Sequence, residues 1–413
     1  MPSLPELGAR AKAASRALAL ASTGAKDEAL RAGADLLLES APEVLAANVA
    51  DVIAAEEAGT AATVVDRLRL TPARLEAMAA GLRQVAALAD PVGEVIDGWT
   101  RPNGLRIRRV RVPLGVVAII YENRPNVTSD AAGLCLKSGN AAFLRGSSAA
   151  IKSNIAVAAA LREGFAKAGL PEDSVVLVED TSHESAREFM QLRDSIDCLI
   201  PRGGPSLIAA ILEHATVPYV IDGDGNCHVY VDKSADLDAA LAIVVNAKTQ
   251  RPSVCNAAES LVVHADVADT FLPRLREAMP EVTFLGDERS CQLIPGASPA
   301  DDAAFGREFL DLTMSVAVAS DLDAAIAHVN RFGTGHTEAI LTADLEAANR
   351  FTHEVDAAAV VVNASTRFTD GEEFGFGAEI GISTQKLHAR GPMGLRELTT
   401  YKYIVEGEGQ IRG

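Results

Sequence analysis

The sequence predicts an α/β protein with two domains, each built on a sheet of mostly parallel strands. From about Arg106 onward, short β-rich apolar runs alternate with helical stretches, which is typical of parallel α/β sheets. A second alternation of the same kind begins near residue 236. The chain has 413 residues, too many for one ordinary hydrophobic core, so we expect two or three domains.

Residues 3–90 are expected to form a helical cover. The region is rich in Ala, Leu and charged residues, and apolar positions such as Leu30, Ala34, Leu37 and Leu38 recur at helical spacing. This region precedes the first sheet in the sequence, and its helices are expected to pack against that sheet.

The first sheet is expected to contain five strands, which lie at 116–121, 141–145, 175–179, 196–200 and 217–221. The helices between them are expected near 128–138, 147–168, 182–193 and 206–214. Right-handed crossovers would make this sheet doubly wound, with a nucleotide site at the carboxyl ends of its strands.

The second sheet is expected to contain strands at 259–264, 314–318, 338–342 and 358–363. The expected helices lie at 236–250, 267–278, 321–330 and 344–354. Residues 399–405 form an apolar and aromatic strand whose exposed edge needs a partner. That partner is either another subunit or the basic strand 105–112 of the same chain.

Charge and composition exclude several classes of protein. Acidic residues outnumber basic ones by 56 to 38, and the net charge of -18 argues against binding to nucleic acid or to an anionic membrane. No apolar run approaches the ~20 residues that cross a bilayer. The five cysteines are scattered without metal-ligand spacing. We therefore expect reduced thiols, no metal site and a cytoplasmic location.

Cys255 is the candidate nucleophile. It lies in the segment Gln250–Asn256, in a short connection between an expected helix and an expected strand, close to Arg251. A thiol beside a guanidinium can lose its proton and attack a carbonyl carbon. The alternative is that Cys255 is a buried, unreactive cysteine, as many free cysteines are.

Asn126 follows the first strand of the sheet and precedes a helix, so its amide could donate a hydrogen bond to an oxyanion. The alternative is that Asn126 caps the helix. Arg145 and Ser148 end the next strand and open a helix, an arrangement that favours phosphate. There the alternative is a helix cap by Ser147. His336 is expected to be structural, with no role in proton transfer.

These segments, in this order, resemble the aldehyde dehydrogenase superfamily over essentially the whole chain. The most specific stretches are Val112–Val116, Tyr121–Thr128, Leu136–Asn140, Leu144–Gly146, Gln250–Asn256 and Gly333–Glu338. The resemblance implies a Rossmann-type cofactor domain, a second α/β catalytic domain and a small β oligomerisation element. Their expected ranges are 1–104 with 124–228, then 229–363, then 105–123 with 385–413.

The resemblance also assigns site residues. Cys255 is similar to the family's nucleophile, and Asn126 is similar to its oxyanion-binding amide. The expected cofactor-binding residues are Arg145, Ser148, Gly203, Gly204 and Glu308. Arg145 and the uncharged Ser148 favour NADPH over NADH. A basic side chain with no carboxylate beside it can bind the 2′-phosphate on the adenosine ribose of NADPH.

One departure from the superfamily bears on the reaction. The glutamate that activates water in hydrolytic members is missing, and the corresponding segment here is Ile221-Asp222-Gly223-Asp224. Without that base, an enzyme that forms a thioester should not hydrolyse it. The alternative is that Asp222 or Asp224 takes the place of the missing glutamate and activates water. The resemblance therefore implies reduction of an acyl phosphate to an aldehyde.

Within the superfamily, the resemblance implies NADPH-dependent reduction of L-glutamyl 5-phosphate to L-glutamate 5-semialdehyde through a cysteine thioester, in proline biosynthesis. Arg124, Arg251 and Arg367 are the expected substrate-binding residues. The resemblance further implies a homo-oligomer and a functional link to glutamate kinase. Two competing hypotheses are a hydrolytic NAD-dependent aldehyde dehydrogenase and a non-catalytic nucleotide-binding protein that keeps the fold.

Overall fold

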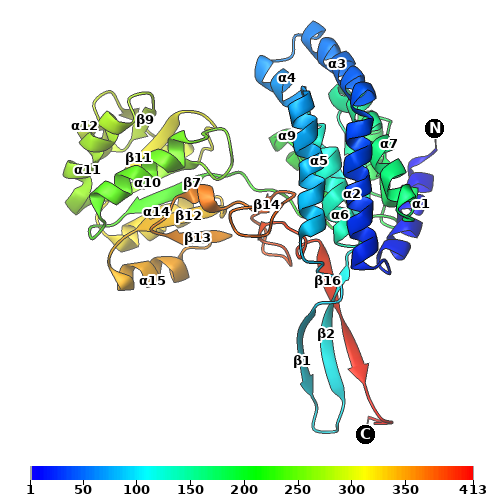
Figure 1. Cartoon of the computed structure of the whole chain (residues 1–413). Helices are drawn as coiled ribbons and strands as arrows, with labels where there is room; N and C mark the ends of the chain where they lie inside the picture. Colours follow the sequence, from blue (N-terminus) through cyan, green and yellow to red (C-terminus); the bar gives the residue numbers. More distant parts are fainter. Residues whose placement is uncertain (1, 413) are drawn as a thin grey trace. The chain divides into compact units, whose positions relative to one another are not determined.

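The computed structural model describes residues 2–412, which divide into two compact units. The first unit contains residues 2–221, 376–381 and 393–412. The second unit contains Asp222–Gly375 and Ile382–Pro392. Both units have the α/β character that the sequence predicts (Figure 1). Within the described residues, no helix is both long and apolar enough to cross a membrane.

Five helices form the N-terminal part of the first unit: α1 (Leu4–Leu18), α2 (Thr23–Glu39), α3 (Ala41–Glu57), α4 (Ala62–Leu68) and α5 (Pro72–Ala87). Hydroxyl side chains of Ser3, Ser22 and Thr71 each accept a hydrogen bond from a backbone N–H in the first turn of α1, α2 and α5. These helices confirm the predicted helical cover. Helix α2 packs on α5 and on α7, which follows the second strand of the adjacent sheet.

The sheet of the first unit contains four parallel strands: β3 (Val116–Tyr121), β4 (Ala141–Gly146), β5 (Val175–Leu177) and β6 (Cys198–Arg202). Their helices are α6 (Asn126–Lys137), α7 (Ile151–Lys167), α8 (His183–Phe189) and α9 (Pro205–His214), with short 3-10 turns η1 (Ser148–Ala150) and η2 (Glu172–Ser174). Every residue of β3 and β4 is buried, as expected for parallel strands covered on both faces.

The predicted fifth strand at 217–221 is wrong. Only Tyr219 forms a bridge there, with Leu199 of β6. Pro218 is the second residue of the segment and has no N–H to donate, so a full ladder cannot form. The first sheet therefore has four strands.

The strand order of this sheet is β5-β4-β3-β6. The chain runs from β3 outward through β4 to β5 and then returns to place β6 on the other side of β3. The strand order thus reverses between β3 and β6. Ligands of open α/β sheets bind at such a reversal, at the carboxyl ends of the strands.

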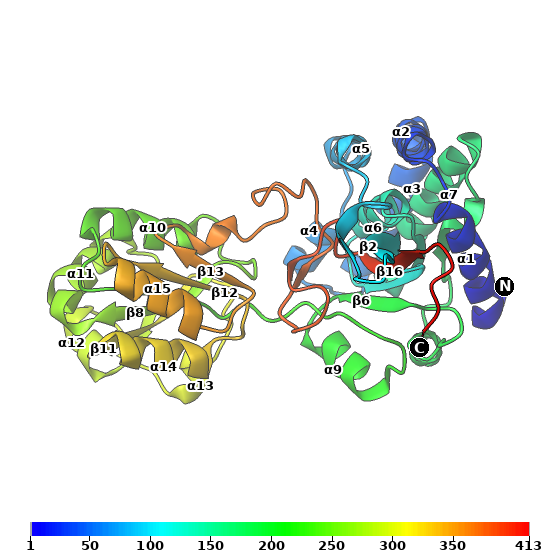
Figure 2. The ribbon, with the colours of Figure 1, turned by 90° about the horizontal axis from the view of Figure 1, so that it is seen from below.

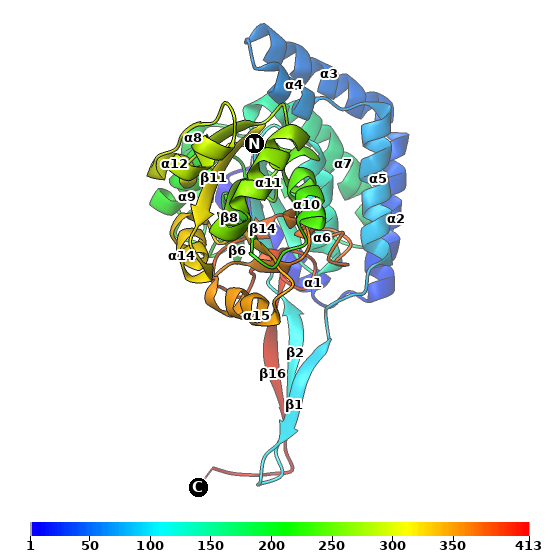
Figure 3. The same cartoon turned by 90° about the vertical axis from the view of Figure 1, so that its left-hand side faces the viewer.

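A separate antiparallel sheet extends from the first unit (Figure 3). Its strands are β1 (Val95–Thr100), β2 (Arg106–Pro113) and β16 (Thr399–Glu406), in the order β1-β2-β16. The tail strand β16 therefore pairs with the basic strand of the same chain, which is one of the two predicted partners. Three aromatic side chains on this sheet remain exposed, namely Trp99, Tyr401 and Tyr403.

The second unit is built on seven parallel strands: β7 (Cys227–Val231), β8 (Ala258–His264), β9 (Thr283–Gly286), β10 (Ser298–Pro299), β11 (Thr313–Ala319), β12 (Thr337–Leu341) and β13 (Ala359–Val362). A two-stranded ribbon adds β14 (Ile382–Ser383) and β15 (Gly391–Pro392). The four predicted strands correspond to β8, β11, β12 and β13. Strands β7, β9 and β10 were not predicted from the sequence.

Helices cover both faces of this sheet (Figure 2). They are α10 (Leu237–Thr249), α11 (Ala265–Ala278), α12 (Glu288–Leu293), α13 (Asp302–Phe305), α14 (Leu322–Phe332) and α15 (Leu345–Glu354), with a 3-10 turn η3 (Thr366–Phe368). Alternate strand residues pack in opposite directions. Leu261 and Val263 join the core under α10 and α11, whereas Val262 packs with Phe351 of α15.

Candidate active site

Cys255 lies in a tight turn between α10 and β8. The N–H of Ala257 donates to the carbonyl of Val254 over 3.0 Å, so Cys255 is the second residue of a β-turn. The thiol is only partly buried, unlike those of Cys135, Cys198 and Cys227. A partly exposed thiol in a fixed turn is suited to attack on a bound substrate.

Three consecutive carbonyls of this turn hold specific donors. The Val254 carbonyl accepts from Ala257 N, the Cys255 carbonyl accepts from the Cys227 thiol over 3.1 Å, and the Asn256 carbonyl accepts from the Thr366 hydroxyl over 2.7 Å. The donors come from the turn itself, from β7 and from η3. The turn is thereby fixed from several directions.

Gly225 fits against the same turn because it has no side chain. A Cβ at this position would lie 1.7 Å from the Cys255 carbonyl oxygen, well inside van der Waals contact. Any larger residue would displace the main chain of Cys255. The short segment that precedes β7 therefore requires glycine here.

Two of the predicted substrate-binding arginines belong to the surroundings of Cys255. Arg367 is half-buried, and its Nε donates to the Gln250 side chain over 2.8 Å. Burial and the charge of the exposed Arg251 lower the pKa of Arg367, whereas Asp370 and the Cys255 thiolate raise it. Arg367 therefore places a positive charge close to Cys255.

Glu308 is tied to the segment beside Cys255. Its Oε1 accepts from the Gly225 N–H over 2.7 Å. Burial is the main cause that raises the pKa of Glu308, the charge of Asp224 raises it further, and the bond from Gly225 lowers it. The carboxylate is half-buried and stays within reach of a ligand hydroxyl.

A fully buried ion pair supports the Glu308 segment. Lys248 Nζ donates to Glu259 Oε2 over 2.6 Å, and both side chains are 0% exposed. Glu259 Oε1 accepts from the N–H of Leu310, a residue held at a positive φ of 58°. Removing Lys248 or Glu259 would leave the other charge buried without a partner. The ion pair therefore holds the segment that contains Glu308 in place.

Asn126 is the first residue of α6, directly after the loop that follows β3. Its side chain does not cap the helix, which was the alternative hypothesis. Instead its Nδ2 donates to Asp130 Oδ2, one turn further along, over 2.9 Å. An amide nitrogen carries two hydrogens, so one remains for an oxyanion. Burial raises the pKa of Asp130 to about 6, against the opposing effect of the Asn126 hydrogen bond.

The predicted phosphate-binding residues lie at the carboxyl ends of β4 and β6. Arg145 is 7% exposed, and its Nη2 donates to the Ser182 carbonyl over 2.7 Å. Its Nε has no hydrogen-bond partner among the described residues. Ser148 is exposed, and Ser147 bonds to Asn123 and does not cap a helix.

Gly203 and Gly204 lie where β6 ends and α9 begins, beside the end of β3. The Gly204 N–H donates to Glu122 Oε2 over 3.2 Å, and a Cβ on Gly203 would lie 2.8 Å from the same oxygen. These glycines occupy the reversal of strand order between β3 and β6. The free donor of Arg145, the uncharged Ser148 and this close backbone approach fit a dinucleotide phosphate.

Several residues that contact the candidate site were not predicted from the sequence. Cys227 and Thr366 bond to the turn around Cys255 from 28 and 110 residues away, so no local pattern could reveal them. Asp130 could have been found, because residues four apart share a helix face. Arg124 lies in the loop between β3 and α6. The described residues include no group of three His, Cys, Asp or Glu side chains arranged to hold a metal ion.

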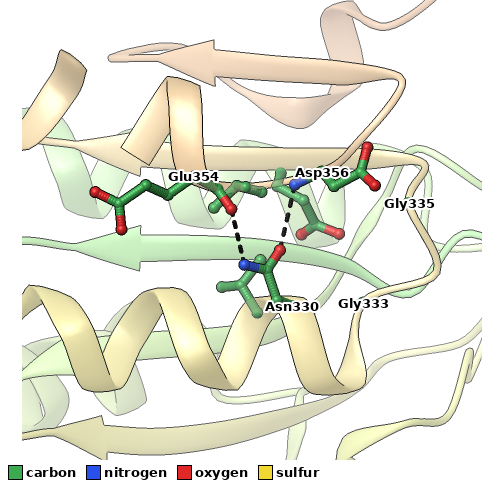
Figure 4. A pocket seen from close by; sticks show the side chains of 8 residues that line it. Asn330, Gly333, Gly335, Glu354 and Asp356 are labelled. Atoms are coloured by element: carbon green, nitrogen blue, oxygen red, sulfur yellow. Dashed lines mark hydrogen bonds between the residues drawn. The ribbon is translucent and has the colours of Figure 1, made fainter. Parts of the chain in front are cut away.

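The Gly333–Glu338 motif has a structural explanation. The Glu338 carboxylate accepts from the His228 backbone N–H over 2.7 Å and lies 3.1 Å from His228 Nδ1, which ties β12 to β7. A cavity of about 280 Å³ adjoins this motif (Figure 4). There the Asn330 side chain bonds to the Glu354 carbonyl and the Asp356 N–H. None of the predicted catalytic residues lines this cavity.

The comparisons with known proteins agree with this architecture. The model of the aldehyde dehydrogenase family matches residues 5–304 and 299–404. A gamma-glutamyl phosphate reductase of Clostridium beijerinckii is 56% identical over 407 residues, which are 98% of this chain and 98% of that protein. One of Moorella thermoacetica is also 56% identical, over 98% of this chain and 97% of its own.

Solved structures show the same relationship. The crystal structure of gamma-glutamyl phosphate reductase from Thermotoga maritima has a TM-score of 0.98 and 48% identity, with 100% of both chains covered. An acetylating aldehyde dehydrogenase from Geobacillus thermoglucosidasius shares the fold at a TM-score of 0.68 and 18% identity, with 98% of this chain and 97% of that chain covered. The chain therefore belongs to the aldehyde dehydrogenase family, in the branch formed by the gamma-glutamyl phosphate reductases.

Proposed function

We propose that this oxidoreductase catalyses the NADPH-dependent reduction of L-glutamyl 5-phosphate to L-glutamate 5-semialdehyde and phosphate, in proline biosynthesis. The observation that carries the proposal is the 56% identity, over 98% of the chain, to relatives named gamma-glutamyl phosphate reductase. The fixed turn around Cys255 supports the same chemistry. We further propose a cytoplasmic location and a functional link to glutamate kinase, whose product is the acyl phosphate.

In the proposed mechanism, the Cys255 thiolate attacks the γ-carbonyl carbon and forms a tetrahedral oxyanion. One Asn126 amide hydrogen and the Cys255 backbone N–H donate to that oxyanion. The carbon–oxygen bond to phosphate then breaks, which leaves a thioester on Cys255. When bound, NADPH would supply a hydride to the thioester carbon. The carbonyl of the resulting alkoxide forms again as the carbon–sulfur bond breaks, which releases the aldehyde and the Cys255 thiolate.

We assign binding of the anionic groups of the substrate to arginines near Cys255 and Asn126. The phosphate and the α-carboxylate are anionic, whereas the protein carries a net charge of -18, so local cations must hold the substrate. Arg251 and Arg367 are the candidates beside Cys255, and Arg124 is the candidate beside Asn126. Planar guanidinium groups bind such oxyanions through paired hydrogen bonds.

The cofactor residues are assigned by position at the sheet ends. Arg145 and Ser148 would hold the adenosine ribose and its 2′-phosphate, Gly203 and Gly204 would face the pyrophosphate, and Glu308 would accept from the nicotinamide ribose. Arg145 offers a free Nε for this purpose. Residues 1–104 with 124–228 would then serve as the cofactor domain and 229–363 as the catalytic domain.

The oligomerisation element implied by the resemblance, residues 105–123 and 385–413, contains the strands β2 and β16, and we propose that the antiparallel sheet they form with β1 is its functional part. This sheet projects from the rest of the first unit, and Tyr403 is 54% exposed on it (Figure 1). Its outer strands β1 and β16 leave edges that can pair with another chain. We therefore propose a homo-oligomer held by this sheet.

Dependence on phosphate tests the proposed function. In the reverse direction, glutamate 5-semialdehyde and NADP should give NADPH continuously only when inorganic phosphate is added, because phosphate must accept the acyl group from Cys255. Arsenate, a phosphate analogue, should replace it. Continuous NADPH formation without either anion would show that water accepts the acyl group and would support the hydrolytic alternative.

A carboxylate at position 148 is expected to weaken the preference for NADPH over NADH. In a Ser148→Glu variant the new charge would repel a 2′-phosphate, and ~1.4 kcal/mol of repulsion would raise the KM for NADPH about tenfold. The KM for NADH should change little, because its ribose hydroxyl can bond to a carboxylate. Ser148→Gln, which adds the same bulk without charge, is the control. Equal KM values for NADPH in the Glu and Gln variants would contradict the assignment.

A further inference from the structure

Cys227 lies directly behind the nucleophile turn. It is the first residue of β7 and is 0% exposed. Its Sγ lies 3.1 Å from the Cys255 carbonyl oxygen and 3.6 Å from Nδ1 of His336. His336 is also 0% exposed and holds the Thr337 hydroxyl at 2.8 Å. The two cysteines differ in environment, because Cys227 is fully buried whereas Cys255 is only partly buried.

Cys227 is a hydrogen-bond donor, because its side chain is a neutral thiol beside a neutral His336 ring. Burial and the nearby charges of Glu338 and Cys255 raise the pKa of Cys227 well above its usual value, so the group remains a thiol. Burial lowers the pKa of His336 to about 4, so the ring is neutral near pH 7. A neutral thiol has one hydrogen to donate, and the Cys255 carbonyl is the nearer acceptor.

We infer that Cys227 is a positioning residue for the nucleophile, with its thiol bonded to the Cys255 carbonyl and its sulfur held in place by His336. This inference rests on the proposed function of Cys255. Gly225 lies against one side of the Cys255 carbonyl. The thiol of Cys227, on β7, donates to the oxygen of that carbonyl and so fixes the direction in which the carbonyl points. The direction of that carbonyl determines the backbone dihedrals of Cys255 and therefore where its side chain points.

The size of the effect follows from the cost of misplacing a nucleophile. A displacement of about 1 Å can reduce a rate about 10²-fold, because reacting atoms must approach to within about 3–3.5 Å in one orientation. The Cys255 carbonyl would also lose its donor in a partly buried site. A loss of Cys227 should therefore lower kcat and leave substrate affinity largely unchanged.

Two substitutions compare a side chain that keeps the donor hydrogen with one that removes it. Cys227→Ser keeps a donor hydrogen in almost the same place, whereas Cys227→Ala removes it. Cys135→Ala is the matched control, because Cys135 is also 0% exposed but lies on α6 in the first unit. Each variant is measured for kcat and KM, for thermal unfolding, and for the rate at which iodoacetamide alkylates Cys255 as a function of pH.

The inference predicts that Cys227→Ala lowers kcat about tenfold, which corresponds to ~1.4 kcal/mol in the transition state, with KM changed less than about twofold. Its pH profile of Cys255 alkylation should also differ from that of the unaltered protein. Cys227→Ser should recover kcat to within about threefold, and Cys135→Ala should match the unaltered protein in both assays.

Three results would overturn the inference. Cys227→Ala could equal Cys135→Ala in kcat and in alkylation, Cys227→Ser could be as slow as Cys227→Ala, or the loss of kcat could only follow the loss of folded protein. If Cys227→Ala does not fold, the alkylation profile and kcat of Cys227→Ser decide the question alone. A normal Cys227→Ala beside an inactive Cys255→Ala would remove this inference and leave the proposed function intact.

Discussion

Replacing Cys255 by Ala is expected to lower turnover at least about 10⁴-fold, because the substitution removes the atom that carries the acyl group. The fold should be unaffected. The bonds that hold the turn, from Ala257 N to Val254 and from Thr366 to Asn256, involve no atom of the Cys255 side chain. Steady-state kinetics and thermal unfolding of the purified variant measure the two effects separately.

Cys291→Ala is the matched control for that experiment. Cys291 is also a partly buried cysteine of the second unit, but it lies on α12, where its thiol bonds to the Gly286 carbonyl. Its variant should turn over normally. A Cys255→Ala protein that works at the unaltered rate would eliminate covalent catalysis by this residue.

Replacing Asn126 by Ala is expected to have the second largest effect, a fall in kcat of about 10²- to 10³-fold. The lost group is the amide hydrogen that is not bonded to Asp130, so the oxyanion would lose one of its two proposed donors. Alkylation of Cys255 by iodoacetamide should stay normal in this variant, because that reaction forms no oxyanion. Kinetics and alkylation rates of the same preparation provide both readouts.

Asp130 offers a graded comparison. In Asp130→Ala the Asn126 amide remains but loses its anchor, so kcat should fall by about tenfold, less than in Asn126→Ala. The assignment would be refuted if Asn126→Ala kept kcat within about twofold of the unaltered protein. It would also be weakened if Asp130→Ala were the slower of the two variants.

The sequence predicted the fold where the signal was local. The strands β3 and β4 are continuous apolar runs, and helices α10, α11, α14 and α15 of the second unit follow regular spacing, so these elements were predicted, whereas the short helices α12 and α13 were not. Strand β7 was missed because it contains His228, whose burial depends on Glu338, 110 residues away. The fifth strand of the first sheet was predicted from apolar residues alone, without regard to Pro218.

The candidate site shows the same division. Cys255, Asn126 and the sheet-end residues Arg145 and Gly204 stand in recognisable local segments, and resemblance to a family assigned their roles. The residues that hold these side chains in place could not be predicted from the local sequence. Thr366, Glu259 and Gly225 act through main-chain contacts that appear only when distant strands are paired, as in the bond from Leu310 N to Glu259.

A direct test of the central claim is peptide mass spectrometry of the protein after incubation with glutamate 5-semialdehyde and NADP in the absence of phosphate. Covalent catalysis by Cys255 predicts one NADPH formed per active site and a glutamyl group on the peptide that contains Cys255. This glutamyl group should disappear when phosphate is added. An unmodified Cys255 peptide despite NADPH formation, or a glutamyl group on another residue, would contradict it.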